Sequence, residues 1–465
     1  MSTTADFEPS VGESKERHPR GLYILFATEM WERFGFYTVA AIMTLFLQDQ
    51  AQGFGWTKAQ ATLLWSNYLM FVYLTPFLGG LIADRVLGYR PSIVIGGVVF
   101  VAGYFLLSLG SPTSFYAALA LIFVGNGFFK PNISTMVGNI YPAGSPLRDA
   151  AYNIFYMGIN VGAFMAPIAA EVLRQRIGFR AAFFAAGVGM GFGTLIFVLF
   201  YRFLADGERR KAPAAPQEIE LTEDLPPVAD HTSSLDKVPE WKRITALLVI
   251  YAIVIVFWMV FHQNGSTMTY WANDNTDWRA SKVTPVLIRV FTLGLIDGSD
   301  VSGVISNAIN PFWIIVLSIP LVRFWKWMNA RGLEPSTPAK MALGMILTCV
   351  AFLILYVGGL AGGDTGRVSP WWIISAYGVL SLGELMLSPM GLSLVSKVAP
   401  TRMRGLMMGG WFVATAIGNK LTMIGIFWTK WKHSTFWLVL AMAALFMAFV
   451  LLALLKPLKR AMPGV

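Results

Sequence analysis

Charged residues are scarce in this sequence. Asp, Glu, Lys and Arg make up 13% of its 465 residues, whereas a soluble globular domain has about 25%. Hydrophobic residues make up 55%, and the mean hydropathy is +0.58. Apolar runs about 20 residues long recur along the chain, which predicts a helical membrane protein with many spans. A transmembrane barrel is excluded, because its strands alternate between apolar and polar residues over about ten positions.

Cysteine and histidine are also rare, which excludes several kinds of site. The single cysteine, Cys349, lies in an apolar segment, so neither a disulfide framework nor a thiolate metal site is expected. The four histidines are far apart in the sequence, and neither H-E-x-x-H nor G-x-S-x-G occurs. We therefore expect no metal, no cofactor and no enzymatic activity; an intramembrane enzyme is kept only as a remote alternative.

The hydrophobic windows form two groups of six. The sequence predicts a polar cytoplasmic tail at 1–20, which has no apolar core and is therefore not a cleaved signal peptide. Two six-helix bundles at 21–204 and 241–457 are joined by a polar linker at 205–240, and a short tail follows at 458–465. The expected spans lie near 20–47, 61–86, 91–110, 114–141, 150–173, 180–204, 243–272, 303–329, 338–360, 370–398, 404–429 and 432–457.

The net charge of +10 predicts an orientation in the membrane. If the N-terminus is cytoplasmic, the cytoplasmic segments hold 23 Lys and Arg residues and the external loops hold 10. Three further cations, Arg33, Lys130 and Lys420, fall within spans. This excess of positive charge on one side predicts that both termini and the linker are cytoplasmic in a cell membrane, and it does not indicate a nucleic-acid partner.

The first span, GLYILFATEMWERFGFYTVAAIMTLFL, carries three charges in its middle. Glu29, Glu32 and Arg33 share one helical face, which Tyr37 extends by a turn. Because a charge at the centre of a bilayer costs roughly 2.5–3.5 kcal/mol even on a lenient scale, this face is expected to point into the bundle. Two acids with one arginine leave an extra carboxylate, which suits reversible protonation.

Polar residues in other spans complement this cluster. Lys130 directly precedes Pro131, where we expect a kink, and Glu384 lies one turn before Pro389. The cations therefore belong to the N-terminal half and the isolated carboxylate to the C-terminal half. A zwitterion about two residues long is expected to bridge them near the middle of the membrane.

The layout resembles the major facilitator superfamily: six plus six spans with a cytoplasmic linker. The loop after the second span, GGLIADRVLGYR, is similar to the superfamily signature G-x-x-x-D-R-x-G-R-[RK]. We expect Asp84, Arg85 and Arg90 to form a latch between helices, which opens when the halves rock. Ordinary positive-inside charge would explain the arginines, but not the glycines together with the aspartate.

Several motifs resemble one family within this superfamily. EMWERFGFY matches the E-x-x-E-R-F-x-x-Y motif of the proton-dependent oligopeptide transporters, and FFKPNISTMVG, FYMGINVGAF, GELMLSPMGLS and GGWFVATAIGN resemble further signatures of that family. The resemblance covers nearly the whole chain. It implies a proton-coupled symporter that imports di- and tripeptides by alternating access, with the fold of twelve helices in two bundles, embedded in the lipid bilayer and functional as a monomer.

The resemblance also implies roles for individual residues. Glu29, Glu32 and Arg33 would couple transport to the proton, and we also expect Lys130 to take part in this coupling. Arg33 and Lys130 would bind the carboxylate of the peptide. The residues expected to hold its ammonium group are Glu384, Asn160 and Asn310, and those expected to line its side-chain pockets are Tyr37, Tyr73, Trp258 and Trp411.

The sequence departs from the family pattern at two places. The polar linker leaves no room for the two extra helices of many bacterial relatives. In VFWMVFHQNGS, His262 stands where the family usually has Asp or Glu, and we expect it to face the cavity as a hydrogen-bond donor or to take part in proton coupling. Since some plant relatives that carry nitrate also have a histidine in this span, transport of nitrate or another small anion stays an alternative.

Overall fold

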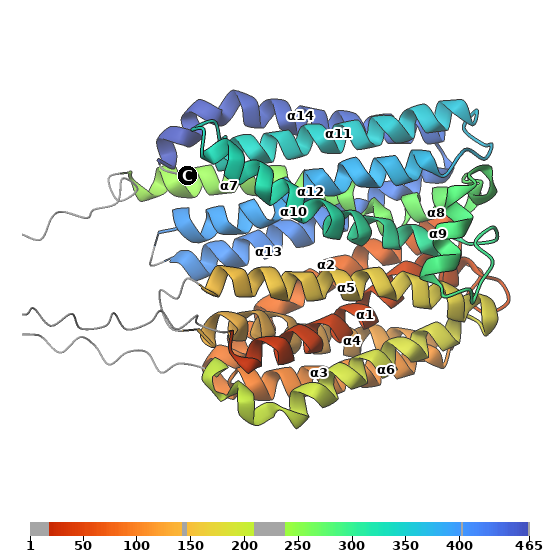
Figure 1. The fold of residues 1–465 in the computed structure, drawn as a ribbon, viewed down its shortest axis with the longest axis horizontal. Helices are drawn as coiled ribbons and strands as arrows, with labels where there is room; N and C mark the ends of the chain where they lie inside the picture. Colours follow the sequence, from red (N-terminus) through yellow and green to blue (C-terminus); the bar gives the residue numbers. More distant parts are fainter. Residues whose placement is uncertain (1–17, 142–146, 209–237, 401–402, 464–465) are drawn as a thin grey trace, which may run out of the picture.

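A computed structural model describes residues 18–141, 147–208, 238–400 and 403–463. Within them the chain forms twelve long helices and two short ones (Figure 1). The short helices are α8 (Thr267–Asp274) and α9 (Val283–Phe291). The long helices are α1 (Arg20–Gln48), α2 (Lys58–Ile82), α3 (Tyr89–Ser108), α4 (Pro112–Asn139), α5 (Leu147–Arg176), α6 (Phe179–Leu199), α7 (Glu240–Phe261), α10 (Ile309–Asn329), α11 (Thr337–Ala361), α12 (Trp371–Val398), α13 (Arg404–Leu421) and α14 (His433–Ala461).

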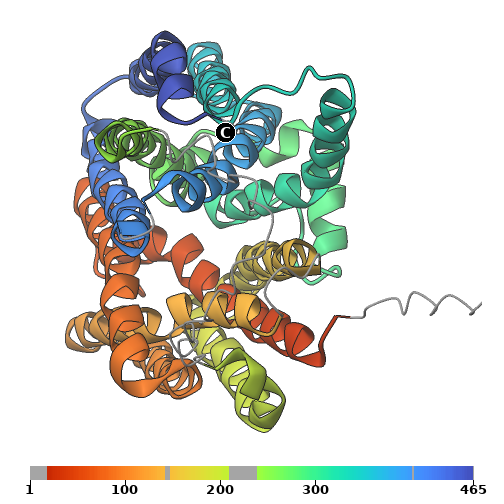
Figure 2. The ribbon, with the colours of Figure 1, turned by 90° about the vertical axis from the view of Figure 1, so that its left-hand side faces the viewer.

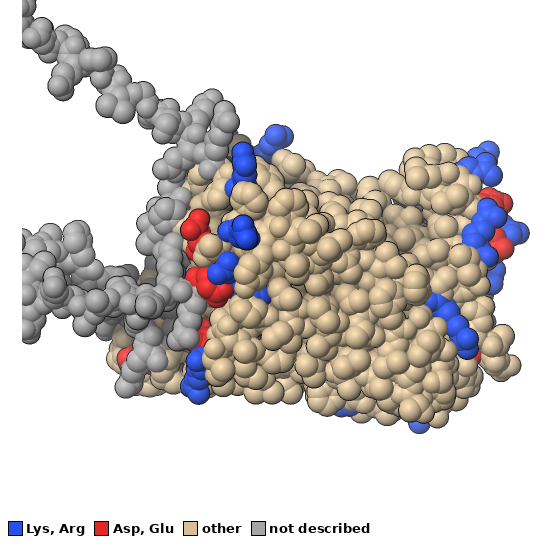
Figure 3. Space-filling view, turned by 90° about the horizontal axis from the view of Figure 1, so that it is seen from below, with Lys and Arg blue, Asp and Glu red and all other residues tan. Residues whose placement is uncertain are grey.

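Eleven helical segments of the described chain are long and apolar enough to cross a membrane, judged by length and composition only. The remaining long helix, α1, has 29 residues and contains the three charges of the first span. The surface agrees with this assignment, because charged side chains gather at both ends of the molecule and the belt between them is almost uncharged (Figure 3). The predicted all-helical membrane fold is confirmed, and its twelve long helices correspond in number to the expected spans.

The long helices form two groups that lie side by side (Figure 2). One buried apolar cluster draws nearly all its members from α1 to α6, and the other draws its members from α7 to α14. Each half of the chain therefore has its own core. The C-terminus lies at one end of the bundle (Figure 1), and the opposite end is called the far end below. Most of the predicted linker, residues 209–237, lies outside the described residues.

Capping residues begin two helices at the positions that the sequence favours. The Thr57 side chain accepts a hydrogen bond from the Gln60 N–H, and the Gln60 side chain accepts one from the Thr57 N–H. Ser111 and Ser114 form the same reciprocal pair before α4, with Pro112 at the first helical position. Both arrangements satisfy N–H groups that a helix start leaves without partners.

The seventh span is broken, whereas the sequence predicts one continuous helix over 243–272. The α-helix ends at Phe261, a 3₁₀ turn spans His262–Gly265, and α8 follows. Gly265 is required at this turn because an added Cβ atom would lie 2.1 Å from the Trp65 ring of α2. The break therefore brings the backbone of the C-terminal half against the N-terminal half, and it frees carbonyl groups at the contact.

Candidate functional site

The three charges of α1 form a buried ion cluster. The Arg33 guanidinium pairs with the carboxylates of Glu32 and Glu29, and the Arg33 Nε to Glu29 Oε1 distance is 3.1 Å. All three side chains are at most 4% exposed. Glu29 Oε2, Glu32 Oε1 and Arg33 Nη2 have no hydrogen-bond partner among the described residues. The cluster therefore keeps one guanidinium nitrogen and two carboxylate oxygens for other ligands.

Glycines of α5 bring this helix directly onto α1 beside the ion cluster. A Cβ atom added at Gly162 would lie 2.2 Å from the Met30 carbonyl oxygen and 3.1 Å from the Arg33 Cβ atom. Gly158, four residues earlier on the same face, packs against Phe26 of α1. Two small residues four apart allow two membrane helices to approach closely. The glycines of FYMGINVGAF therefore fix the position of the face that carries Arg33.

Gly162→Ala is expected to push α5 away from α1, and overpacking of this kind costs about 1–3 kcal/mol. We expect a lower unfolding temperature of the purified protein and reduced transport. Gly191→Ala on α6 is the matched control, because no described atom lies within 4 Å of the added Cβ position. Equal unfolding temperatures for the two variants would contradict the close packing of α1 and α5.

Lys130 lies where α4 crosses α2. Pro131, which follows it, cannot donate a hydrogen bond to the Gly127 carbonyl, and α4 nevertheless continues through it to Asn139. That carbonyl oxygen lies 1.9 Å from where a Cβ atom of Gly79 would be, so α2 packs tightly at this point. The Lys130 ammonium group rests over the Tyr73 ring, 4.3 Å from its centroid. Lys130 makes no ion pair within 4 Å among the described carboxylates, although it interacts electrostatically with Glu29 and Glu32, and its ammonium group contacts the aromatic face.

His262 extends this aromatic contact into the C-terminal half. Its ring stacks on Trp258 at 4.8 Å and lies 5.9 Å from Tyr73, and it is 8% exposed. Its Nδ1 atom and the Trp258 indole nitrogen have no partners among the described residues. The rings that carry these two nitrogens both contact Tyr73, over which the Lys130 ammonium group rests.

Glu384 is held by Asn310 in the C-terminal half, and Ser381 holds Asn310 in turn. Asn310 Nδ2 of α10 donates to Glu384 Oε2 at 2.9 Å and to Ser381 Oγ at 2.8 Å. Ser381 was not among the predicted site residues, although it lies three positions before Glu384 on the same helical face. Asn160 of α5 donates from its side chain to the Tyr156 carbonyl at 2.9 Å, within its own helix.

Tyrosines of the N-terminal half lie within electrostatic range of the charged groups of both halves. Tyr37 and Tyr73 are each close enough to interact electrostatically with both Arg33 and Glu384. Tyr156, another residue that we did not predict, is also within electrostatic range of Glu384. The cationic and anionic groups therefore face a common region lined by tyrosines.

Trp411 is packed inside the C-terminal half. Its ring packs edge-on against Tyr251 with 6.3 Å between centroids, and against Gly391, where an added Cβ atom would lie 1.9 Å away. It is 4% exposed. Its role in lining a side-chain pocket stays a prediction.

The loop after α2 is arranged differently from a simple pair of Asp84 with an arginine. Asp84 Oδ1 accepts a hydrogen bond from the Tyr89 hydroxyl at 2.8 Å. Arg90 pairs with Glu208, after α6, at 2.8 Å and stacks over the Tyr201 ring. Arg90 thus ties the start of α3 to the end of α6, while Arg85 is exposed. The latch function of these residues stays a prediction.

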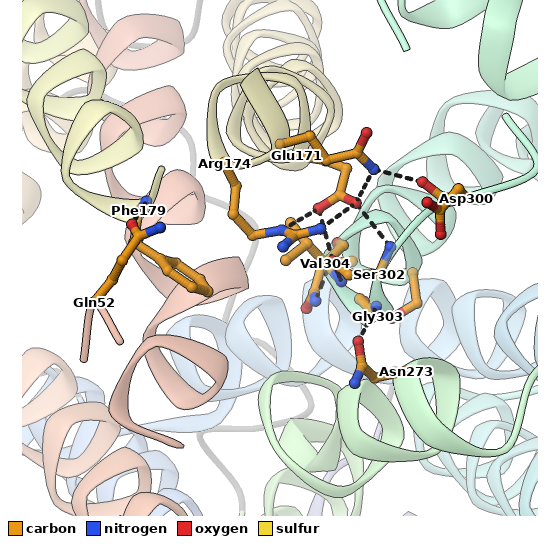
Figure 4. A network of polar contacts seen from close by, with 12 residues as sticks. Gln52, Glu171, Arg174, Phe179, Asn273, Asp300, Ser302, Gly303 and Val304 are labelled. Carbon is orange, nitrogen blue, oxygen red and sulfur yellow. Dashed lines mark hydrogen bonds and ion pairs between the residues drawn. The ribbon is translucent and has the colours of Figure 1, made fainter. Parts of the chain in front are cut away.

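The far end of the bundle is closed by hydrogen bonds between the halves. Glu171 of α5, which is fully buried, accepts hydrogen bonds from the Ser302 N–H and hydroxyl, both at 2.7 Å, and from Arg174 and Gln175 (Figure 4). Gln175 also donates to the Asp300 carbonyl at 2.6 Å. The carboxylate of one half thus holds the backbone that leads into α10.

Further contacts of this kind continue toward the middle. Trp65 Nε1 donates to the His262 carbonyl at 3.1 Å, and Thr44 donates to the Gly265 carbonyl at 3.0 Å, so the break after α7 supplies acceptors to α1 and α2. Hydrogen bonds between the halves, from the middle to the far end, join the pairs Thr44–Gly265, Lys58–Asp274, Lys58–Tyr270, Thr62–Tyr270, Trp65–His262, Asn67–Lys420, Glu171–Ser302, Gln175–Asp300 and Arg176–Leu295.

Glu171→Gln is expected to destabilise the closed far end. Both oxygens of the Glu171 carboxylate accept hydrogen bonds, whereas the amide has only one acceptor oxygen. Hydrogen bonds to a charged group contribute about 1.5–3 kcal/mol. A loss of that size shifts an equilibrium between closed and open states roughly tenfold or more. A pair of spin labels at the far end, one in each half, should report a larger fraction of molecules with the far end open. Glu334→Gln, which removes the partner of Lys340 within the C-terminal half, is the control. An unchanged distance distribution for Glu171→Gln would contradict the closing role of Glu171.

The chain is similar to known proteins along nearly its whole length. The sequence model of the POT family (PTR2) matches residues 90–217 and 218–437. A Di-/tripeptide transporter of Lactococcus lactis subsp. cremoris is 31% identical over 507 residues, covering 96% of this chain and 97% of the relative. Dipeptide and tripeptide permease A of Escherichia coli (strain K12) is 30% identical and covers 90% of this chain and 86% of its own length.

A solved structure is similar as well. The crystal structure of a peptide transporter POT in complex with sulfate superposes with a TM-score of 0.82 at 27% identity and covers 98% of each chain. The predicted resemblance is thereby confirmed, and a transporter replaces the remote alternative of an intramembrane enzyme. The chain belongs to the POT family of proton-dependent oligopeptide transporters, within the major facilitator superfamily.

Proposed function

We propose that the protein is a proton-coupled symporter that imports di- and tripeptides. One observation carries this proposal: Tyr73 contacts the Lys130 ammonium group and lies within electrostatic range of both Arg33, in the N-terminal half, and Glu384, in the C-terminal half. A peptide with a free carboxylate and a free ammonium group has the opposite charge at each end. Its binding would therefore link the two halves, as alternating access requires.

Arg33 and Lys130 bind the carboxylate of the peptide. Arg33 has an unused guanidinium nitrogen, and Lys130 rests on an aromatic face rather than on an acid, so both have donors available. Glu384 binds the ammonium group, with Asn310 and Ser381 fixing the direction of its carboxylate. Charge-assisted hydrogen bonds at both ends then select for zwitterions.

Glu29 and Glu32 carry the coupled proton. Both lie beside one guanidinium and each has one oxygen without a partner among the described residues. Protonation of one acid weakens its pairing with Arg33 and leaves the guanidinium to the peptide carboxylate. Binding of the proton and of the peptide thereby become linked through Arg33.

The closed far end corresponds to the external side of a cell membrane, with both termini in the cytoplasm. The sequence places the excess of Lys and Arg on the side of the membrane where both termini lie, which supports this orientation. The two halves, 21–204 and 241–457, then rock about the bound peptide, and the contacts of Glu171 break when the external side opens. We propose that one chain suffices, because each half of the substrate site comes from this chain.

Competition in a counterflow assay tests the substrate class. Proteoliposomes loaded with unlabelled dipeptide should take up labelled dipeptide, and external dipeptide should compete while N-acetylated dipeptide and nitrate should not. Competition by nitrate at concentrations similar to those of dipeptide would favour the small-anion alternative. The carboxylate of Glu384 argues against that alternative, because an anion needs no partner for an ammonium group.

His262→Gln separates two roles of the histidine. The protonated imidazole is a cation, whereas the acid usual at this position is neutral when protonated, so proton coupling through His262 would add charge near Lys130. If His262 takes part in coupling, proton-driven accumulation should fall, while counterflow, which needs binding and rocking without net proton movement, should survive. If both assays match wild type from about pH 5 to 8, His262 is only a hydrogen-bond donor in the pocket.

A further inference from the structure

Helix α9 presents an apolar face to the outside of the bundle. Val283, Val286, Leu287 and Val290 recur at intervals of three and four residues and are 45–61% exposed, whereas Thr284 and Ile288 on the opposite face are buried. A soluble loop rarely exposes so continuous an apolar surface. The pattern is therefore that of a helix with one side against the protein and the other against an apolar medium.

The turn after α9 shows the same preference. Leu293 is 87% exposed and has φ = 53°. This left-handed backbone conformation is rare for leucine and is usually occupied by glycine or asparagine. The N–H groups of residues 292–295 all donate to backbone carbonyls of residues 288–292. A turn with these N–H groups satisfied internally, and with a leucine at its tip, is suited to lipid surroundings.

The apolar face continues into the lipid-facing surface of two spans. Phe291 of α9 packs against Phe164 of α5, with 5.2 Å between ring centroids, and against Phe312 of α10, with 6.3 Å. Phe164 lies twelve residues before the end of α5, which is about 18 Å along a helix at 1.5 Å per residue. The end of α9 is therefore at the depth of the membrane spans and not in the loops beyond them.

A small apolar cavity lies under the helix. It has a volume of about 120 Å³ and is lined by α5, α9, the turn Gly303–Ala308 and α10, with Phe164, Leu287 and Phe312 among its walls. The cationic side chains of Lys282 and Arg289 are exposed, and Arg289 interacts electrostatically with Asp297. Cations flanking an apolar face complement the phosphate groups that border an acyl layer.

We propose that α9 inserts into the far leaflet of the bilayer, with phospholipid acyl chains covering the face formed by Val283, Val286, Leu287 and Val290. The helix enters this leaflet without crossing the membrane. The same connection continues to Ser302, which binds Glu171 and closes the far end. The bilayer thus holds the closing segment at a fixed depth. This inference does not depend on the identity of the substrate.

Spin-label accessibility tests the location of α9. The only cysteine, Cys349, is buried and is replaced by alanine, and single cysteines are placed at Val290 and Val286. Val316→Cys on the exposed surface of α10 is the lipid control, and Ala51→Cys in the α1–α2 connection is the aqueous control. Nitroxide relaxation is measured with oxygen and with a water-soluble nickel chelate, in vesicles of phosphatidylcholine and phosphatidylglycerol.

We expect the labels at Val290 and Val286 to resemble that at Val316, with oxygen access at least several-fold higher, relative to nickel, than at Ala51. Nickel access as high as at Ala51 would place α9 in water and overturn the proposal. Low access to both reagents would show that protein, such as a second copy of the chain, covers the face, and would overturn it equally. Circular dichroism and thermal unfolding of each labelled variant establish that it is folded.

Discussion

Lys130→Ala is expected to abolish proton-driven uptake of dipeptides. The variant removes one of the two cations near Glu29 and Glu32, so that both acids face Arg33 alone and that guanidinium is less available to the peptide. The peptide carboxylate also loses a charged donor worth about 1.5–3 kcal/mol. Both effects weaken binding of the peptide carboxylate. We therefore expect accumulation of dipeptide in proteoliposomes to fall to background.

Two variants control this result. Lys130→Arg keeps the cation over Tyr73 and should retain part of the transport, although the planar guanidinium differs in shape. Lys326→Ala removes an exposed lysine of α10 and should transport as wild type. Wild-type uptake by Lys130→Ala with an unshifted pH profile would mean that the ammonium group serves only to pack on Tyr73.

Glu384→Gln should weaken binding of free dipeptides by at least tenfold, because the partner of the substrate ammonium loses its charge. The amide keeps the shape of the side chain and its contact with Asn310, so folding should be little affected. N-acetylated dipeptides have no ammonium group, and their weak binding should change far less. Calorimetry with both ligands gives the comparison directly.

Asn310→Asp offers a matched test of the same contact. It replaces the donor to Glu384 by a second acid, so that two adjacent carboxylates would compete for one proton.

Equal losses of affinity for free and N-acetylated dipeptides in Glu384→Gln would contradict the assignment of Glu384 to the ammonium group.

The arrangement of the charged residues could be predicted because charge inside a membrane is costly. Glu29, Glu32 and Arg33 had to share one face and to point into the bundle, and they form a buried ion cluster. Twelve spans followed from the length of the apolar runs. The contact of Glu384 with Asn310 agrees with the family resemblance, although the binding role of the pair is still a proposal.

Contacts between distant segments could not be predicted in this way. The break at His262–Gly265 falls in the polar stretch HQNGST, but that stretch alone does not show that the helix stops there. The close approach of Trp65 to Gly265 depends on packing between the halves. Glu171 stands near the end of its span, where a charge has no obvious cost, and its partner Ser302 is 131 residues away in sequence. A carboxylate two residues inside the predicted end of the span at 173 was the available signal.

Uptake of a labelled dipeptide into proteoliposomes under an imposed inward proton gradient tests the central claim most directly. The account predicts accumulation above the equilibrium level, collapse of that accumulation on addition of a protonophore, and acidification of the lumen that depends on added dipeptide. Dipeptide that only equilibrates across the membrane, at the same rate with and without the proton gradient, would contradict proton-coupled symport.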